Sequence, residues 1–220
     1  PNVGKLKPGS VSLQVDLNAG KLTVEGTVEQ QPLQKLGLHG VVPLNIPELM
    51  DNPGLAKDLP LEAKLVLPKS ALSFLPTFVP MLQRINGTLA LNAEIKGTVT
   101  TPQISGELQA EVPELGFADA SLPGIKNLQI NLVATDQGVT IRNAEMLVSG
   151  GPLKLTGGVG LQDLRDPTLD LKLLAEEILV KRDDMISLRA NADISCQGKL
   201  SAATVQGKVD LVRGRVFKEV

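Results

Sequence analysis

Aliphatic and polar residues alternate along most of this chain with a period of two residues. Leu91, Ala93 and Ile95, for example, are separated by Asn92 and Glu94. Successive side chains of a β-strand point to opposite faces, so this spacing predicts strands with one apolar and one polar face. The apolar positions are nearly all Leu, Val, Ile and Ala, because the 220 residues include no Trp, no Tyr and only four Phe. The sequence therefore predicts an all-β chain with an extensive aliphatic surface.

Strand-like alternation recurs from one end of the chain to the other. The segments 11–17 and 22–28 predict a hairpin around a turn at Asn18–Gly20, and 61–67 predicts a further strand. The later predicted strands are Gly87–Val99, Ile104–Val112, Leu128–Ala134, Val139–Val148, Leu153–Leu161, Leu169–Leu173, Leu188–Gly198 and Val205–Leu211. Several of the short connections between them contain Gly, Pro or Asp, which suit tight reversals. This order predicts antiparallel hairpins in one elongated, curled β-sheet.

Three segments break the alternation. The prolines within Gln30–Pro60 disfavour long helices and central strands, so we expect loop and edge structure there. Within Lys69–Ile85, apolar residues recur at helical spacing and are interrupted by Pro76 and Pro80, which predicts one or two short helical turns. Glu176–Ile186 is predicted as a short helix.

A repeat of longer period supports the stacked arrangement. The spacing of Gly97, Pro102, Ile104 and Gly106 returns at Gly198, Ala203, Val205 and Gly207. Recurrence of this kind is typical of elongated proteins in which each unit contacts mainly its neighbours.

Composition and charge argue against some classes of function. The formal net charge is −2, and the basic residues form no stripe interleaved with aromatic side chains, so we expect no nucleic-acid partner. Cys196 is the single cysteine, which excludes an internal disulfide. Its place after Ala192 and Ile194 predicts a small buried hydrophobic side chain rather than a reactive thiol.

No group of residues in the sequence indicates catalysis or metal binding. His39 is the single histidine, and it lies in the proline-rich segment without a second histidine or a cysteine nearby. The carboxylates at polar strand positions are Glu94, Glu107, Glu111, Asp170, Asp193 and Asp210. A general acid needs a raised pKa in an apolar pocket, which a solvated strand face does not provide. We therefore expect no catalytic residue, no metal and no cofactor.

The aliphatic face admits two interpretations. In a β-sandwich, two such faces close on each other and exclude everything else. Sandwich cores usually contain large aromatic rings. The scarcity of aromatic residues in this sequence therefore favours one curled sheet with an open, concave apolar face. About a dozen strands spaced about 4.8 Å apart would extend this groove over roughly 60 Å, which suits a conduit better than a pocket.

Such a face suits the alkyl chains of lipids, because acyl tails need dry walls without hydrogen-bonding groups. The candidate lining residues of this lipid groove are Leu89, Leu91, Ile95, Ile104, Leu108, Leu128, Ile130, Leu132, Ile141, Leu153, Leu155, Val159, Leu169, Leu171, Leu173, Ile194, Val209 and Leu211.

Several segments, taken in order, resemble the C-terminal region of the TamB family, which are AsmA-like proteins of the translocation and assembly module. The segments are 61–67, 72–85 with its Phe-Leu-Pro and Val-Pro breaks, Asn86–Leu91, Gly97–Gly106, Gly150–Gly157 and Gly207–Phe217. The resemblance covers about Leu59 to the end. We expect residues 1–220 to form one section of an elongated β-groove, with a TamB-like part at 59–220 and a proline-rich part at 1–58.

The resemblance implies a large periplasmic protein that is anchored in the inner membrane by an N-terminal helix. It implies a taco-shaped groove that moves phospholipids between the inner and outer membranes, with their acyl chains as the bound partner. The family is also linked to outer-membrane protein assembly with a barrel partner of the Omp85 type. A scaffold for that assembly, presenting strand edges to partners, is therefore the alternative function.

Two further expectations concern the limits of the chain and its oligomeric state. The chain opens at Pro1 without a methionine, shows no signal peptide or membrane span, and ends inside the strand-like segment 209–220. We therefore expect a section of a longer protein from which the anchor is absent. An exposed apolar groove also predicts a groove-to-groove homodimer.

Overall fold

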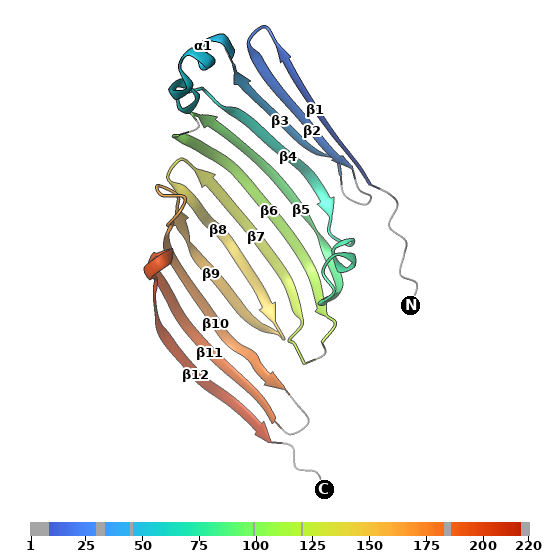
Figure 1. The fold of residues 1–220 in the computed structure, drawn as a ribbon. Coiled ribbons are helices and arrows are strands. Elements are labelled where there is room, and N and C mark those ends of the chain that lie inside the picture. The colour runs from blue at the N-terminus through green and yellow to red at the C-terminus, as the bar shows by residue number, and fades with distance from the viewer. Residues whose placement is uncertain are drawn as a thin grey trace.

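The computed structural model describes residues 9–29, 34–44, 46–98, 100–119, 121–182 and 186–216. Within them the chain forms one sheet of twelve antiparallel strands that pair in the order of the sequence (Figure 1). β1 and β12 are the two edge strands. The all-β prediction is confirmed, and the β-sandwich alternative is wrong, because the described residues form a single sheet.

The strands are long and the helices are short. The strands are β1 (Ser10–Asn18), β2 (Lys21–Glu29), β3 (Leu36–Pro43), β4 (Glu62–Ala71), β5 (Leu82–Gly97), β6 (Pro102–Phe117), β7 (Ile125–Thr135), β8 (Gly138–Val148), β9 (Gly151–Gly160), β10 (Thr168–Arg182), β11 (Ile186–Lys199) and β12 (Thr204–Val216). The helical elements are α1 (Ile46–Asp51) and the 3-10 turns η1 (Pro53–Lys57), η2 (Leu75–Thr77) and η3 (Leu200–Ala202). Among the described residues, no helix has the length and the apolar content that a membrane crossing requires.

The strand register separates the sheet into an apolar face and a polar face. Leu91 lies directly opposite Leu108 of β6, which in turn lies opposite Leu132 of β7. Directly opposed residues of antiparallel strands share a face, so these leucines mark the apolar face. Glu94 lies opposite Lys64 of β4 on the polar face. The period-two pattern of the sequence is therefore carried through the register into two chemically different sides.

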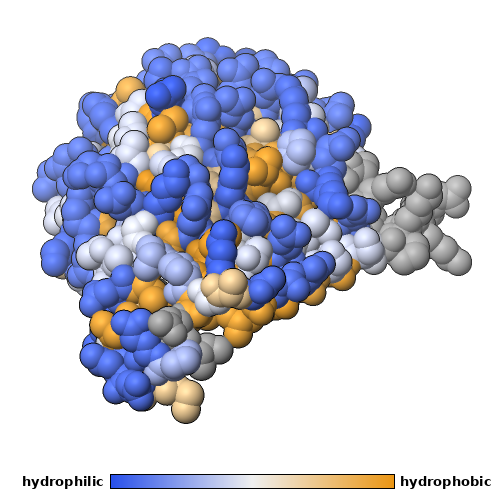
Figure 2. Space-filling model, turned by 90° about the horizontal axis from the view of Figure 1, so that it is seen from above, coloured by the Kyte–Doolittle hydropathy of each residue, from blue (hydrophilic) through white to orange (hydrophobic). Residues whose placement is uncertain are grey.

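Irregularities in the strand pairing bend the sheet. Register shifts occur between Leu67 and Ser70 in β4, Asn86 and Thr88 in β5, Lys126 and Gln129 in β7, Ile141 and Glu145 in β8, and Ala175 and Ile178 in β10. Such bulges bend a strand and increase its twist. Seen from above, hydrophilic side chains cover the outer arc of the molecule and hydrophobic ones gather inside it (Figure 2). The sheet is thus curled around its apolar face, as predicted.

The prediction of a helix at Glu176–Ile186 is wrong. Strand β10 continues to Arg182 and β11 begins at Ile186, while residues 183–185 lie outside the described residues. The polar residues that disrupt the alternation belong to a bulge, in which Glu177 has a φ of 46°. An extra residue in a strand shifts the period-two pattern by one position, and this shift resembles a change to helical spacing.

The proline-rich segment is more regular than expected. Strand β3 is an inner strand that pairs with both β2 and β4, so the prediction of loop and edge structure is wrong there. Pro43 is the last residue of β3, where a missing N–H costs little, and Pro53 begins η1. In the next irregular segment, η2 confirms a short helical turn, whereas Leu82–Ile85 already belongs to β5.

Candidate functional site: the apolar face of the sheet

The candidate lining residues all lie on the apolar face. Register connects them across the sheet: Ile95 lies opposite Ile104, Leu155 opposite Leu173, and Leu173 opposite Ile194. By strand they are Leu89, Leu91 and Ile95 of β5, Ile104 and Leu108 of β6, Leu128, Ile130 and Leu132 of β7, Ile141 of β8, Leu153, Leu155 and Val159 of β9, Leu169, Leu171 and Leu173 of β10, Ile194 of β11, and Val209 and Leu211 of β12. Their contact with lipid stays a prediction.

The apolar face is accessible to solvent over most of its extent. Lining residues of the inner strands β5 to β11 are half-buried, whereas Val209 and Leu211 on the edge strand are 60% and 70% exposed. At the other edge, Val11 and Leu13 of β1 are 77% and 66% exposed. A face that packed against a second layer would be buried throughout. This wall is therefore available to an apolar ligand over most of its extent.

The buried core of the described residues is small and lies on the same face. It consists of Leu67, Leu72, Ile85, Ala110, Val112, Ala144, Val148, Ala175 and Ala190. The alanines lie close to the register shifts, where the sheet bends. Small side chains fit the inner side of such a bend, where larger ones would collide.

Two groups of residues on the apolar face are missing from the predicted lining. The first consists of Leu13, Leu38 and Leu65 on the first four strands, which register places on the same face. The second consists of small residues such as Ala110 and Ala190. Both groups occupy period-two positions, so the alternating pattern already placed them on the apolar face. The small residues were missed because only large aliphatic side chains were chosen as lining residues.

Glycines allow neighbouring strands to approach closely on the apolar face. A Cβ atom at Gly157 would lie 1.9 Å from the backbone oxygen of Asp170, and Gly157 has a φ of 110°. A Cβ atom at Gly106 would lie 2.5 Å from the backbone oxygen of Asn92. No other residue fits these positions without a shift of the backbone.

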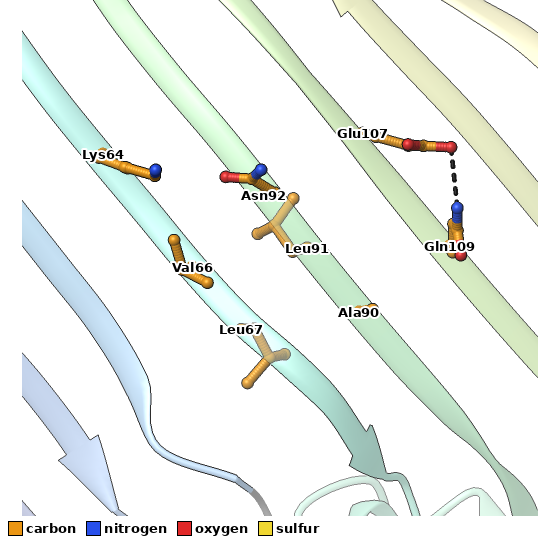
Figure 3. A pocket seen from close by; sticks show the side chains of 8 residues that line it. All are labelled: Lys64, Val66, Leu67, Ala90, Leu91, Asn92, Glu107 and Gln109. Carbon is orange, nitrogen blue, oxygen red and sulfur yellow. Dashed lines mark hydrogen bonds between the residues drawn. The ribbon is translucent and has the colours of Figure 1, made fainter.

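The polar face has charged side chains and shallow hollows. One hollow of about 310 Å³ is lined by residues including Lys64, Asn92, Glu107 and Gln109 (Figure 3). Hydrogen bonds donated by Gln109 and Asn131 lower the pKa of Glu107 below its ordinary value. The carboxylate therefore stays ionised, whereas a general acid at neutral pH needs a raised pKa.

The single histidine and the single cysteine occupy different faces. His39 of β3 is exposed on the polar face, with Nδ1 3.6 Å from Oε1 of Glu25, which agrees with a surface role. Cys196 of β11 is a half-buried free thiol opposite Leu171 and Val205 on the apolar face. In the part of the chain that the structure describes, no group of three or more His, Cys, Asp or Glu residues could hold a metal ion.

Comparison with protein families gives a match over part of the chain. Residues 140–220, which run from β8 to the end of the chain, match the family model of the TamB C-terminal domain. This part of the chain is therefore a TamB-family region, as the resemblance predicted, and for residues 59–139 the resemblance stays a prediction. No curated protein and no solved structure gives a significant match to the chain.

Proposed function

We propose that this protein is a non-enzymatic lipid conduit in which phospholipid acyl chains lie against the apolar face. The observation that carries this proposal is the open aliphatic face of a single curled sheet. Removal of apolar surface from water is favourable by roughly 25 cal/mol per Å², so an acyl chain on this face is favoured over an exposed one. The headgroups would remain at the open side of the groove, in contact with water.

The TamB match supports a cellular setting for this activity. In our proposal the chain is a section of a TamB-like protein in the periplasm, held at the inner membrane, that moves phospholipids between the inner and outer membranes. A continuous wall that stays apolar from β5 to β12 suits passage of a chain from strand to strand. Because no step of this transfer makes or breaks a covalent bond, the proposal requires no catalytic group.

A charge placed on the apolar face tests the proposal. Ile130→Arg inserts a guanidinium into the dry wall, where desolvation of a charge is costly, so we expect bound lipid to be lost. Gln129→Arg is the matched control. Gln129 is the exposed neighbour of Ile130 on β7, and its side chain points to the polar face. The measurement is native mass spectrometry of each purified protein, with analysis of the lipid extracted from it.

The two variants separate the possible outcomes. Lipid on the unsubstituted protein and on Gln129→Arg, but not on Ile130→Arg, supports the conduit. Equal lipid on all three proteins, or a lipid-free unsubstituted protein in the presence of phospholipid vesicles, contradicts it. Far-ultraviolet circular dichroism checks that each variant keeps its sheet.

The open edges of the sheet favour a second candidate function. Among the residues that the structure describes, β1 and β12 each pair on one side only, and an unpaired strand edge can accept a strand from another protein. This arrangement suits a scaffold for outer-membrane protein assembly with a barrel partner of the Omp85 type. Under this alternative, strand addition at an edge is the function, and lipid binding is not required.

Proline substitution in β12 distinguishes the two candidates. Neighbouring residues of a strand direct their N–H groups to opposite sides, so one of Val205→Pro and Gln206→Pro removes a donor at the free edge of β12. If the scaffold is correct, the variant that lacks the free-edge N–H no longer binds an Omp85-type barrel in a pull-down but still binds lipid. If both proline variants still bind the barrel and lipid, the scaffold is wrong.

A further inference from the structure

The connection between β4 and β5 folds onto the apolar face of the sheet. This connecting segment, residues 72–81, contains η2 and lies beside the ends of its two strands (Figure 1). Leu72 is only 6% exposed and forms a buried cluster with Ile85 of β5 and Val112 of β6. Leu75, Leu89, Leu115 and Leu128 pack against this cluster. The segment therefore places two of its own leucines on the face that we propose for lipid.

The packing occupies part of the candidate lining. Leu89 and Leu128 were selected from the sequence as groove residues, and both contact the cluster. Their environment is an aliphatic one supplied by the chain itself. Leucine side chains and an acyl chain present the same kind of surface, so either can cover these residues without any change in hydrogen bonding.

The attachment of the segment to the sheet is limited. Its described backbone hydrogen bonds to the flanking chain lie near its two ends. At the start, Leu72 N–H donates to the oxygen of Gly87 of β5 (2.9 Å). Near the other end, Leu82 N–H donates to the oxygen of Val79 (2.9 Å), and Ala118 N–H, one residue after β6, donates to the oxygen of Met81 (2.9 Å). Between these ends, the described backbone bonds are internal, such as Phe78 N–H to the oxygen of Leu75. Apart from these backbone bonds, the segment is held on the face by the side chains of Leu72, at its start, and of Leu75.

The outer side of the segment also carries exposed apolar side chains. Phe78 and Met81 are 61% and 60% exposed, and the rings of Phe74 and Phe78 meet edge to face at 6.1 Å. Residues 70–82 contain no charged side chain. Ser73 and Thr77 are exposed beside these apolar side chains. The outer side of the segment is therefore uncharged but mixed in polarity, and its contact with the apolar face is made through Leu72 and Leu75.

We infer that Ile85, Leu89, Val112 and Leu128 form a subsite for one alkyl chain, occupied in this structure by Leu72 and Leu75 of the connecting segment. A lipid acyl chain takes the place of the two leucines, and the segment moves off the face. The inference rests on the proposed lipid-conduit function and adds a location at which the chain's own residues compete with the ligand.

Photocrosslinking at two positions tests the inference. A photoreactive amino acid is placed at Leu128, beside the segment, or at Leu171 of β10, on the open part of the face. Each protein is mixed with phosphatidylcholine vesicles that contain a fluorescent phospholipid, and the label transferred to protein is measured. We expect Leu75→Ser to raise labelling at position 128 severalfold and to leave labelling at position 171 unchanged.

The matched control is Phe78→Ser, which removes an exposed apolar side chain from the same segment without touching the cluster. It should leave labelling at both positions unchanged. If Leu75→Ser leaves position 128 unlabelled while position 171 is labelled, the inference is overturned and the conduit stands. If neither the unsubstituted protein nor Leu75→Ser is labelled at position 128 or at position 171, the conduit itself fails.

Hydrogen–deuterium exchange on the unsubstituted chain gives a second readout that does not depend on the folding of a variant. Lipid should accelerate exchange in residues 73–80, because the segment leaves the face. Unchanged or slower exchange in these residues, with lipid bound, overturns the inference.

Discussion

At the scale of single residues, small side chains decide how tightly this sheet can curl. Ala110, Ala144, Ala175 and Ala190 are buried on the apolar face, and Ala190 is only 1% exposed. Gly157 has the same effect within β9, since its backbone lies against β10 more closely than a Cβ atom would allow. The large aliphatic residues make the wall apolar, but the small ones set its shape.

Gly157→Ala should therefore destabilise the protein. Both the positive φ of 110° and the 1.9 Å approach to the Asp170 oxygen oppose a Cβ atom. We expect a loss of about 1–3 kcal/mol in the free energy of unfolding, measured by urea denaturation. Gly124→Ala is the control, because nothing lies within 4 Å of its Cβ position. Equal unfolding midpoints for the two variants would contradict this account of β9.

At the scale of elements, the bulge in β10 is held by side chains of β11. The N–H of Glu177 donates a hydrogen bond of 2.8 Å to Oδ1 of Asn191. The guanidinium of Arg189 donates to the backbone oxygens of Glu177 and of Ser149, and so connects the bulge to the turn between β8 and β9. The left-handed conformation of Glu177 is thus supported from the neighbouring strand.

Asn191→Ala should weaken this bulge. The N–H of Glu177 would lose its side-chain acceptor, and a typical hydrogen bond contributes about 0.5–1.5 kcal/mol to stability. We expect a decrease of that size in the free energy of unfolding, with faster amide exchange at Glu177. Asn92→Ala, an exposed residue on the polar face of β5, should change neither quantity. If the two variants behave alike, Asn191 does not support the bulge.

A carboxylate joins two connections at the same end of the sheet and makes that junction sensitive to acid. Hydrogen bonds from the backbone N–H and the hydroxyl of Ser201, with a contribution from Lys199, lower the pKa of Asp166 below its ordinary value. A lowered pKa in the folded state stabilises the protein above the ordinary carboxyl pKa, and this contribution disappears as the pH falls through the folded-state pKa.

We therefore expect amide protection at Ser201 to be present at neutral pH and to be lost as the pH falls below about 4. Asp166→Asn should lower this protection at neutral pH and remove its pH dependence, whereas Asp136→Asn, at a different turn, should retain both. The measurement is the protection factor of the Ser201 amide from hydrogen exchange. Protection at Ser201 that does not depend on pH in the unsubstituted protein would exclude this role for Asp166.

At the scale of the whole molecule, the chain exposes an apolar groove and two strand edges together. The exposed fractions of Val11, Leu13, Val15 and Leu17 run from 77% to 50% along β1. Soluble proteins rarely expose contiguous apolar surface without a partner. The groove-to-groove homodimer stays a prediction, and lipid would compete with it for the same surface.

Self-association should therefore increase with protein concentration and decrease when phospholipid is added. We expect Leu13→Lys combined with Val15→Lys to reduce it, because both side chains lie on the apolar face. Ser12→Lys combined with Gln14→Lys places the same charges on the polar face of β1 and should have little effect. Light scattering coupled to size-exclusion chromatography measures the mass. If the two double variants reduce self-association equally, the protein associates through a strand edge rather than through the groove.

Much of the architecture was predictable, because strand periodicity is a local property. The alternation at Leu91, Ala93 and Ile95 located β5, and similar runs located most other strands and their apolar side. The prediction failed where a local irregularity imitates another structure. At Glu176 and Glu177 a bulge interrupts the period, and in Gln30–Pro60 the prolines concealed the inner strand β3.

The candidate lining was predictable to the same extent. Residues such as Leu155 and Ile194 share a face because both the spacing along a strand and the register between strands preserve it. The cluster that brings Leu72 and Leu75 to the same place as Leu89 and Leu128 was not predictable from periodicity. It depends on the path of a connection outside the strands, which no alternating pattern describes.

By itself the sequence determined an all-β chain with one aliphatic and one polar side, because each residue's face follows from its position along its own strand. Only the tertiary structure decided that the aliphatic side remains open. An identical alternation would serve a sheet packed against a second sheet, so the difference depends on where distant strands lie. Here the twelve strands pair in sequence order as one sheet whose bulges curl it, and the apolar face stays accessible along the groove.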